Sequence, residues 1–173
     1  MKSVLISIQP KWCELIASGK KTVEVRKTKP KLETPFKVYI YCTANKNGTK
    51  DLLEIHGTDG KIRKANGKVI GEFVCDKVVE FENSMYEPAF HETSVLSCVE
   101  YEKLALYLGK KDFGYGWHIS NLVIYDEPRE LSEFSSGSSR LEFSNTEDGF
   151  PLKWSGMKRP PQSWCYVESE GGK

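Results

Sequence analysis

Residues 19–26, which read GKKTVEVR, constrain the fold of this chain more than any other stretch. From Thr22 to Arg26 polar and apolar side chains alternate, and this period of two is typical of a β-strand. We therefore predict a strand over residues 21–26, with its two valines facing the core. Its polar row would consist of Lys21, Thr22, Glu24 and Arg26. A solvated edge strand shows the same alternation, so the pattern alone does not give that row a function.

The segment before this octapeptide predicts a compact structural unit. Residues 5–8 are mostly apolar and are followed by Pro10, as in a short buried strand. Residues 11–18 predict a two-turn helix that stops at Gly19. A glycine permits a tight turn from helix to strand, and this turn would bring Trp12 of the helix close to the polar row.

The remaining pattern is that of an α+β chain in which strands dominate. Further strands are expected at residues 36–43, 68–81, 116–125 and 163–167, from their continuous apolar or alternating patterns. We expect all the strands to close into one small barrel-like sheet. A second helix is expected over residues 99–108, with Ser97 as its N-cap.

The chain of 173 residues fits one domain, which we assign to residues 1–130 and 159–170. Residues 44–66 are rich in Gly, Asn and Asp and predict a long loop or hairpin, with a helical turn near residues 51–56. Residues 131–158 contain a Ser/Gly run and little periodicity, so we expect a flexible insertion before the last strand.

The charge distribution favours a small anionic ligand over a long duplex. The net charge is +1, but residues 1–40 hold nine Lys or Arg against three Glu, a balance of +6. A protein that coats nucleic acid without sequence preference is basic over a whole face, whereas this chain is basic only around the octapeptide. Lys27, Lys29 and Lys31 extend that basic stretch, and a solvated loop would contain the same residues.

Cysteine and histidine usage gives no indication of a metal or another cofactor. The five cysteines are odd in number and widely scattered, and none forms a Cys-x-x-Cys pair or lies at zinc spacing from a histidine. We interpret them as reduced thiols and expect no metal site and no cofactor. No stretch is apolar enough for a membrane span or a signal peptide, so a cytoplasmic protein is expected.

Four segments in this order resemble the ASCH family, a branch of the PUA-like superfamily. The octapeptide carries the pattern Gly-x-Lys-x-x-Glu-x-Arg, and residues 68–73 and 115–125 resemble the central and late strands of the family. Residues 159–167 resemble the last strand of prophage-type ASCH proteins of Gram-positive bacteria. This resemblance implies a PUA-like β-barrel with flanking helices, in which the octapeptide lines a cleft.

Candidate site residues follow from the octapeptide, the aromatic residues and the resemblance. We expect a ligand to contact Trp12, Lys20, Lys21, Thr22, Glu24, Arg26, Trp117 and Gln162. Arg26 would bind a phosphate or a base carbonyl, and Glu24 would accept from an amino group. Between them we expect an exposed ion pair that contributes little to stability. For Trp117 and the other aromatic residues, core packing is the structural alternative.

Three functions remain open at this stage. The leading hypothesis is an RNA-, nucleotide- or modified-nucleoside-binding module. The second is a hydrolase of a modified nucleobase or of RNA, with Lys21 and Glu24 as catalytic residues. Amidohydrolases of the same superfamily have a threonine where this chain has Glu24, and Thr22 is the nearest substitute. The third is a phage-associated protein-interaction domain. The sequence does not indicate an oligomeric state.

Overall fold

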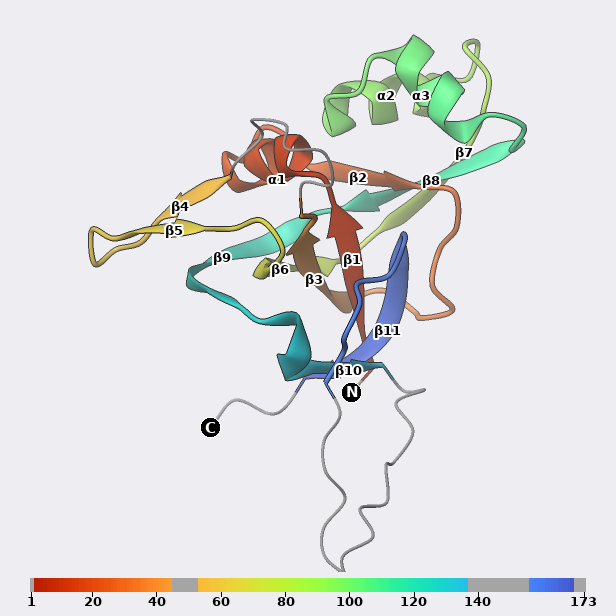
Figure 1. Cartoon of the computed structure of the whole chain (residues 1–173). Helices are drawn as coiled ribbons and strands as arrows, with labels where there is room; N and C mark the ends of the chain where they lie inside the picture. Colours follow the sequence, from red (N-terminus) through yellow and green to blue (C-terminus); the bar gives the residue numbers. More distant parts are fainter. Residues whose placement is uncertain (1, 45–52, 137–155, 170–173) are drawn as a thin grey trace, which may run out of the picture.

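The computed structural model describes residues 2–44, 53–136 and 156–169 (Figure 1). In chain order the elements are β1 (Ser3–Ile8), α1 (Pro10–Ala17), β2 (Val23–Arg26), β3 (Phe36–Cys42), β4 (Glu54–His56), β5 (Ile62–Lys64), β6 (Val69–Cys75), β7 (Val78–Glu82), α2 (Pro88–Ser97), α3 (Tyr101–Leu108), β8 (Phe113–His118), β9 (Ser120–Arg129), a 3-10 turn (Leu131–Glu133), β10 (Phe134–Ser136) and β11 (Trp164–Ser169). The fold is therefore α+β, as expected.

The larger sheet has six strands in the order β10-β11-β1-β3-β6-β9. All six residues of β1 are buried. β1 pairs in parallel with β3 and antiparallel with β11. A parallel neighbour cannot be reached through a tight turn, so the chain crosses over between β1 and β3, and α1 and β2 lie in that crossover. The crossover thus carries the octapeptide out of the large sheet.

β2 belongs to a second sheet, with the order β2-β8-β7. One face of this sheet packs against α2 and α3 through an apolar cluster of Val25, Phe81, Phe90, Leu104 and Leu108. Figure 1 shows this helical pair on the side of β7 and β8 that faces away from β10 and β11. Glu24 and Arg26 lie opposite Trp117 and Tyr115 in the β2–β8 register, so these four residues share the other face.

The two sheets meet at a corner where two strands bend together. β6 continues into β7 through Asp76 and Lys77, and β8 continues into β9 through Ile119. The His118 N–H donates to the Lys77 carbonyl at 2.9 Å, and the His118 Nδ1 lies 2.6 Å from the Asp76 carboxylate. Each bent strand therefore belongs to the large sheet on one side of the corner and to the small sheet on the other.

This corner corrects the prediction that all the strands form a single sheet. The strands expected at residues 68–81 and 116–125 are each two strands in different sheets, because the chain bends at each corner. The described strands form a six-stranded, a three-stranded and a two-stranded sheet. The strands expected at residues 5–8, 21–26 and 36–43 are confirmed by β1, β2 and β3, and that at residues 163–167 by β11. The helix expected before the octapeptide is confirmed by α1.

Ser97 plays a different role from the one predicted. It is the last residue of α2, a helix that the sequence pattern did not predict, and Cys98 follows in a left-handed conformation with φ of 55°. α3 then begins at Tyr101 with Glu100 as its N-cap residue. The left-handed residue breaks the helical path, so the expected helix over residues 99–108 starts two residues later.

The two irregular regions also contain more structure than predicted. β4 and β5 form a two-stranded hairpin, so Glu54–His56 is a strand and not a helical turn. The expected insertion begins with ordered elements, because β10 pairs with β11 and Phe134 is fully buried. Most of that segment, residues 137–155, lies outside the described residues, as do residues 45–52.

Candidate functional site

The turn between α1 and β2 fixes the octapeptide against two helices. Gly19 adopts a φ of +73°, a left-handed conformation that favours glycine after a helix. The Lys21 N–H donates to the Leu15 carbonyl of α1 at 3.0 Å, and the Thr22 N–H donates to the Leu96 carbonyl of α2 at 2.9 Å. The start of β2 is thereby held between α1 and α2.

A carboxylate between two cations forms the centre of the candidate site. Glu24 Oε2 lies 3.2 Å from Lys21 Nζ, and Glu24 Oε1 lies 3.0 Å from Arg26 Nη2. Lys21 also donates to the Ser97 carbonyl at 2.8 Å, and Arg26 donates to the Ser7 carbonyl at 2.7 Å. The charge cluster of Lys21, Glu24 and Arg26 therefore connects β2 to α2 and to β1.

This charge cluster is buried, and the expectation of an exposed ion pair is wrong. Lys21 is 3 % exposed, Glu24 6 % and Arg26 9 %. The strand pattern shows which side chains share a face, but it does not show that groups of α1, β1 and the C-terminal end of α2 contact the charged side chains. Because its members are desolvated, their ion pairs are stronger than surface pairs and more costly to break.

The charge cluster carries an excess of positive charge. Two cations face one carboxylate, and the Nε–H of Arg26 is buried without a hydrogen-bond partner in the part of the chain that the structure describes. Buried excess charge and unpaired buried donors both cost free energy. The arrangement is therefore suited to receive one further anion or hydrogen-bond acceptor.

Aromatic side chains from two helices border the charge cluster. Trp12 of α1 is half-buried, and its ring centre lies 5.2 Å from Lys21 Nζ. Tyr107 of α3 is 40 % exposed, and its ring centre lies 5.0 Å from the Nζ of Lys27, the residue after Arg26. Partial burial raises the pKa of Tyr107, and the Arg26 guanidinium opposes that rise. The solvent-accessible border of the cluster thus contains an indole and a phenol ring, as stacking on a nucleobase requires.

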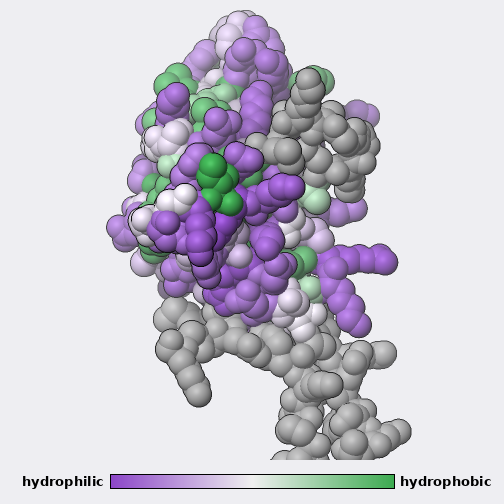
Figure 2. All heavy atoms as spheres, turned by 60° about the vertical axis from the view of Figure 1, so that its left-hand side comes forward, coloured by the Kyte–Doolittle hydropathy of each residue, from purple (hydrophilic) through white to green (hydrophobic). Residues whose placement is uncertain are grey.

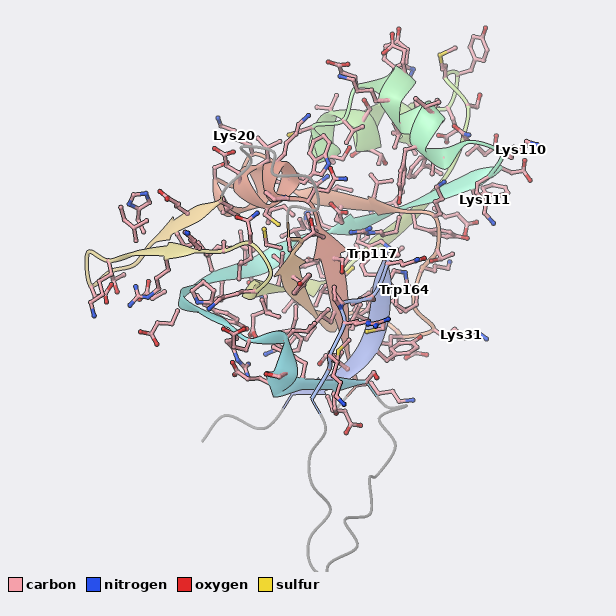
Figure 3. All side chains as sticks on the ribbon, viewed as in Figure 1. Lys20, Lys31, Lys110, Lys111, Trp117 and Trp164 are labelled. Carbon is pink, nitrogen blue, oxygen red and sulfur yellow. The ribbon has the colours of Figure 1, made fainter. Side chains whose placement is uncertain are left out.

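The other predicted site residues lie in different environments. Lys20 is exposed, and in Figure 3 its label lies beside α1, on the opposite side of the view from Lys110 and Lys111. Thr22 is half-buried beside the cluster. Gln162 is exposed between Pro161 and Ser163, whose carbonyls accept hydrogen bonds from Ser7. Gln162 is thus linked to Arg26 through Ser7.

Trp117 has no surface left for a ligand. It is fully buried, and its ring contacts Phe36 and Trp164 at centroid distances of 5.8 Å each. Figure 3 shows Trp117 and Trp164 near each other at the centre of the molecule. The core-packing alternative therefore describes Trp117 correctly, because a ring enclosed on all sides cannot stack on a base.

Sequence reasoning missed three groups of the site. These are the phenol of Tyr107 and the carbonyl groups of Ser97 and Ser7. Tyr107 is far from the octapeptide in sequence, and only the packing of α3 brings it near. A backbone carbonyl leaves no signal in the side-chain pattern. Neither kind of partner could have been found from residue spacing.

Residues 2–44, 53–136 and 156–169 contain no candidate metal site and no helix that could span a membrane. No three His, Cys, Asp or Glu side chains there lie close enough to hold a metal ion. None of the helices described is both long and apolar enough to cross a bilayer. All five cysteines are free thiols.

The protein has an α+β fold with a charged helix–turn–strand unit beside its sheets. The sequence profile of the ASCH domain matches residues 6–125, well over half of the chain. The chain therefore belongs to the ASCH domain family. Comparison with curated proteins finds no match.

Solved structures of one bacterial ASCH protein have the same fold. The ASCH protein from Zymomonas mobilis aligns with a TM-score of 0.61 and 18 % identity, over 96 % of this chain and 87 % of that one. Its tyrosine-to-phenylalanine mutant aligns with a TM-score of 0.63 and 18 % identity, over 97 % and 91 % of the two chains. At this identity the likeness shows the fold alone.

Proposed function

We propose that this chain is a nucleic-acid-binding ASCH module that holds one base or modified nucleoside against Trp12 and Tyr107. A phosphate or base carbonyl oxygen would accept from Lys21 and Arg26. The observation that carries the proposal is the buried excess of positive charge in the charge cluster, beside the unpaired Arg26 Nε–H. A nucleotide supplies both missing features, an acceptor for the guanidinium and a flat ring for the aromatic border.

Family membership supports the same function. ASCH domains are PUA-like modules that are generally associated with nucleic-acid binding. In this proposal the two sheets and their shared corner correspond to the PUA-like barrel. The relation of residues 159–167 to prophage-type proteins of Gram-positive bacteria stays a prediction.

The catalytic alternative, with Lys21 and Glu24 as an acid–base pair, has less support. Lys21 Nζ is already engaged by Glu24 and by the Ser97 carbonyl. Glu24 in turn is held between two cations. Because both of its carboxylate oxygens are engaged, Glu24 can act on a substrate only by breaking a buried ion pair.

Titration with nucleoside monophosphates, modified nucleosides and short RNA tests the proposal. The decisive variant is Tyr107→Leu, and Tyr101→Leu is its matched control. Both tyrosines lie on α3 and are 40 % and 41 % exposed, but the ring of Tyr101 faces His91 at 6.1 Å. Loss of one base–aromatic stack should weaken binding by about 1–3 kcal/mol in Tyr107→Leu alone. No binding by the unmodified protein, or equal losses in both variants, would contradict the proposal.

A further inference from the structure

A second candidate surface begins where β2 ends. A hollow of about 430 Å³ is lined by Lys27, Thr28, Lys29, Lys111, Asp112, Phe113 and Tyr115. Three lysines face one aspartate on its walls, and we call it the basic hollow. A neighbouring hollow of about 620 Å³ shares Lys111, Asp112 and Phe113 with it and adds Glu82 and Lys110, whose charges cancel. The positive excess therefore belongs to the basic hollow.

The basic hollow continues directly from the charge cluster. Lys27 follows Arg26 in the chain, and its Nζ lies 5.0 Å from the ring centre of Tyr107. Tyr115 is the register partner of Arg26 across β2 and β8. The basic hollow therefore begins at the residue that follows the charge cluster in β2.

Aromatic rings and lysines both line the hollow. Phe113 and Tyr115 are two residues apart on β8 and so share a face, and Phe113 is 43 % exposed. Lys29 Nζ lies 5.1 Å from the Tyr115 ring centre and 3.4 Å from the Glu80 carboxylate, in an exposed ion pair. An exposed pair of this length is weak, so Lys29 can exchange Glu80 for a phosphate.

Figure 3 shows three lysines on the side of the molecule where the basic hollow lies. Lys31, Lys110 and Lys111 lie on one side of the molecule in this view, whereas Lys20 lies near α1 on the other side. Figure 2, turned toward the left-hand side of Figure 1, shows a mostly hydrophilic face with hydrophobic residues in small groups.

We infer that the basic hollow binds the sugar-phosphate backbone and an adjacent base of a single-stranded nucleic acid. This inference rests on the proposed function, because one base of the same strand would occupy the charge cluster. Lysines beside exposed aromatic faces are typical of single-strand binding, where phosphates pair with cations and bases stack on rings. A duplex keeps its base faces stacked inside and offers the rings no partner. The ligand is thus a strand of several nucleotides, not a mononucleotide.

The test compares two double variants with equal charge changes. Lys29→Gln with Lys111→Gln removes two lysines from the basic hollow. Lys61→Gln with Lys64→Gln removes two exposed lysines at the β4–β5 hairpin, where Lys61 also has a long exposed ion pair, 3.7 Å to Asp59. Anisotropy titrations would use RNA and DNA single strands of about eight nucleotides, a duplex of the same length and a mononucleotide.

For the hollow variant, we expect the logarithm of the single-strand affinity to fall less steeply with the logarithm of the salt concentration. The slope should be smaller by about 1.4, because two phosphate contacts are lost at about 0.7 each. At 0.1 M salt this corresponds to an affinity roughly 25-fold weaker. Its mononucleotide affinity and the single-strand affinity of the hairpin variant should stay unchanged.

Three results would overturn the inference. They are an unchanged single-strand affinity in the hollow variant, an equal loss in the hairpin variant, and an equal loss of duplex binding. In each case mononucleotide binding by the unmodified protein would leave the proposed function standing. If the unmodified protein binds neither mononucleotide nor strand, the proposed function fails, and this inference fails with it.

Discussion

Arg26 donates a 2.7 Å hydrogen bond to the carbonyl of Ser7, and this bond joins β2 of the small sheet to β1 of the large one. Ser7 is itself fixed by the chain before β11, since its N–H donates to the Ser163 carbonyl and its hydroxyl donates to the Pro161 carbonyl. The guanidinium of the candidate site is therefore also a structural contact between the two sheets.

Replacing Arg26 should cost stability as well as binding. In Arg26→Ala the buried carboxylate of Glu24 still pairs with Lys21 but no longer with a second cation. Removing one partner of a buried ion pair lowers the unfolding free energy by about 3–5 kcal/mol. Urea unfolding of the variant measures this loss. Lys29→Ala is the control, because its pair with Glu80 is exposed and should contribute only about 0–1 kcal/mol. Similar small losses in both variants would mean that the Arg26 pair is not desolvated in solution.

Removing the central carboxylate should make the protein respond to anions. Glu24→Gln leaves Lys21 and Arg26 buried with no counter-charge, so the variant should be less stable than the unmodified protein. Inorganic phosphate should then raise its melting temperature more than that of the unmodified protein, because an anion can replace the lost carboxylate. Glu92→Gln, at an exposed position of α2, is the control. Equal responses to phosphate in the three proteins would show that the charge cluster does not bind anions.

Gly71 lies where β6 and β9 approach closely, at a shift in their register. A Cβ at this position would collide with the Val123 carbonyl oxygen and would lie 3.1 Å from Ile124 Cα. Gly71→Ala should therefore lower the unfolding free energy by about 1–3 kcal/mol or more. Gly19→Ala provides the comparison, because no atom lies within 4 Å and only the left-handed backbone, at about 1–2 kcal/mol, opposes the change. An unchanged unfolding free energy in Gly71→Ala would mean that β6 and β9 can move apart locally without loss of stability.

Glu72 should make part of the stability dependent on pH. Burial would raise the pKa of Glu72, but hydrogen bonds from Lys37 at 2.7 Å and Tyr125 at 2.6 Å lower it overall. A folded pKa below the unfolded value of about 4.3 gives stability that is present above that pH and is lost as the pH falls. Between about pH 5 and pH 3 the unfolding free energy should thus fall less in Glu72→Gln than in the unmodified protein. Glu92→Gln, at an exposed position of α2, should behave like the unmodified protein.

Local signals made the octapeptide and its surroundings predictable. The alternation from Thr22 to Arg26, the glycine after α1 and the apolar run of β1 are short-range features, and each gave the correct element. The strand corners were missed, because apolar residues resume directly after Asp76 and Lys77 and again after Ser120 and Asn121, so each stretch was interpreted as one strand. α2 was missed for a related reason. Its buried residues are Phe90, Thr93 and Ser97, and two of these three are polar.

The candidate site was predicted in part. The sequence grouped Lys21, Glu24, Arg26 and Trp12 correctly, since all four belong to one helix–turn–strand unit. Their burial was not predicted, because charged side chains in alternation normally indicate a solvent-facing strand. Their partners outside this unit are the carbonyls of Ser7 in β1 and of Ser97 at the end of α2, and the approach of these groups depends on tertiary packing alone.

The position of β11 beside β1 has a consequence for how the chain is made. Ser3 pairs with Val167, so this inner strand of the large sheet lacks one neighbour until residue 167 has been synthesised. At about 5–20 residues per second, β1 would wait roughly 8–30 s on the ribosome for that partner. During this interval its apolar edge is open to other chains, so newly made protein should depend on protection from aggregation more than the finished fold does.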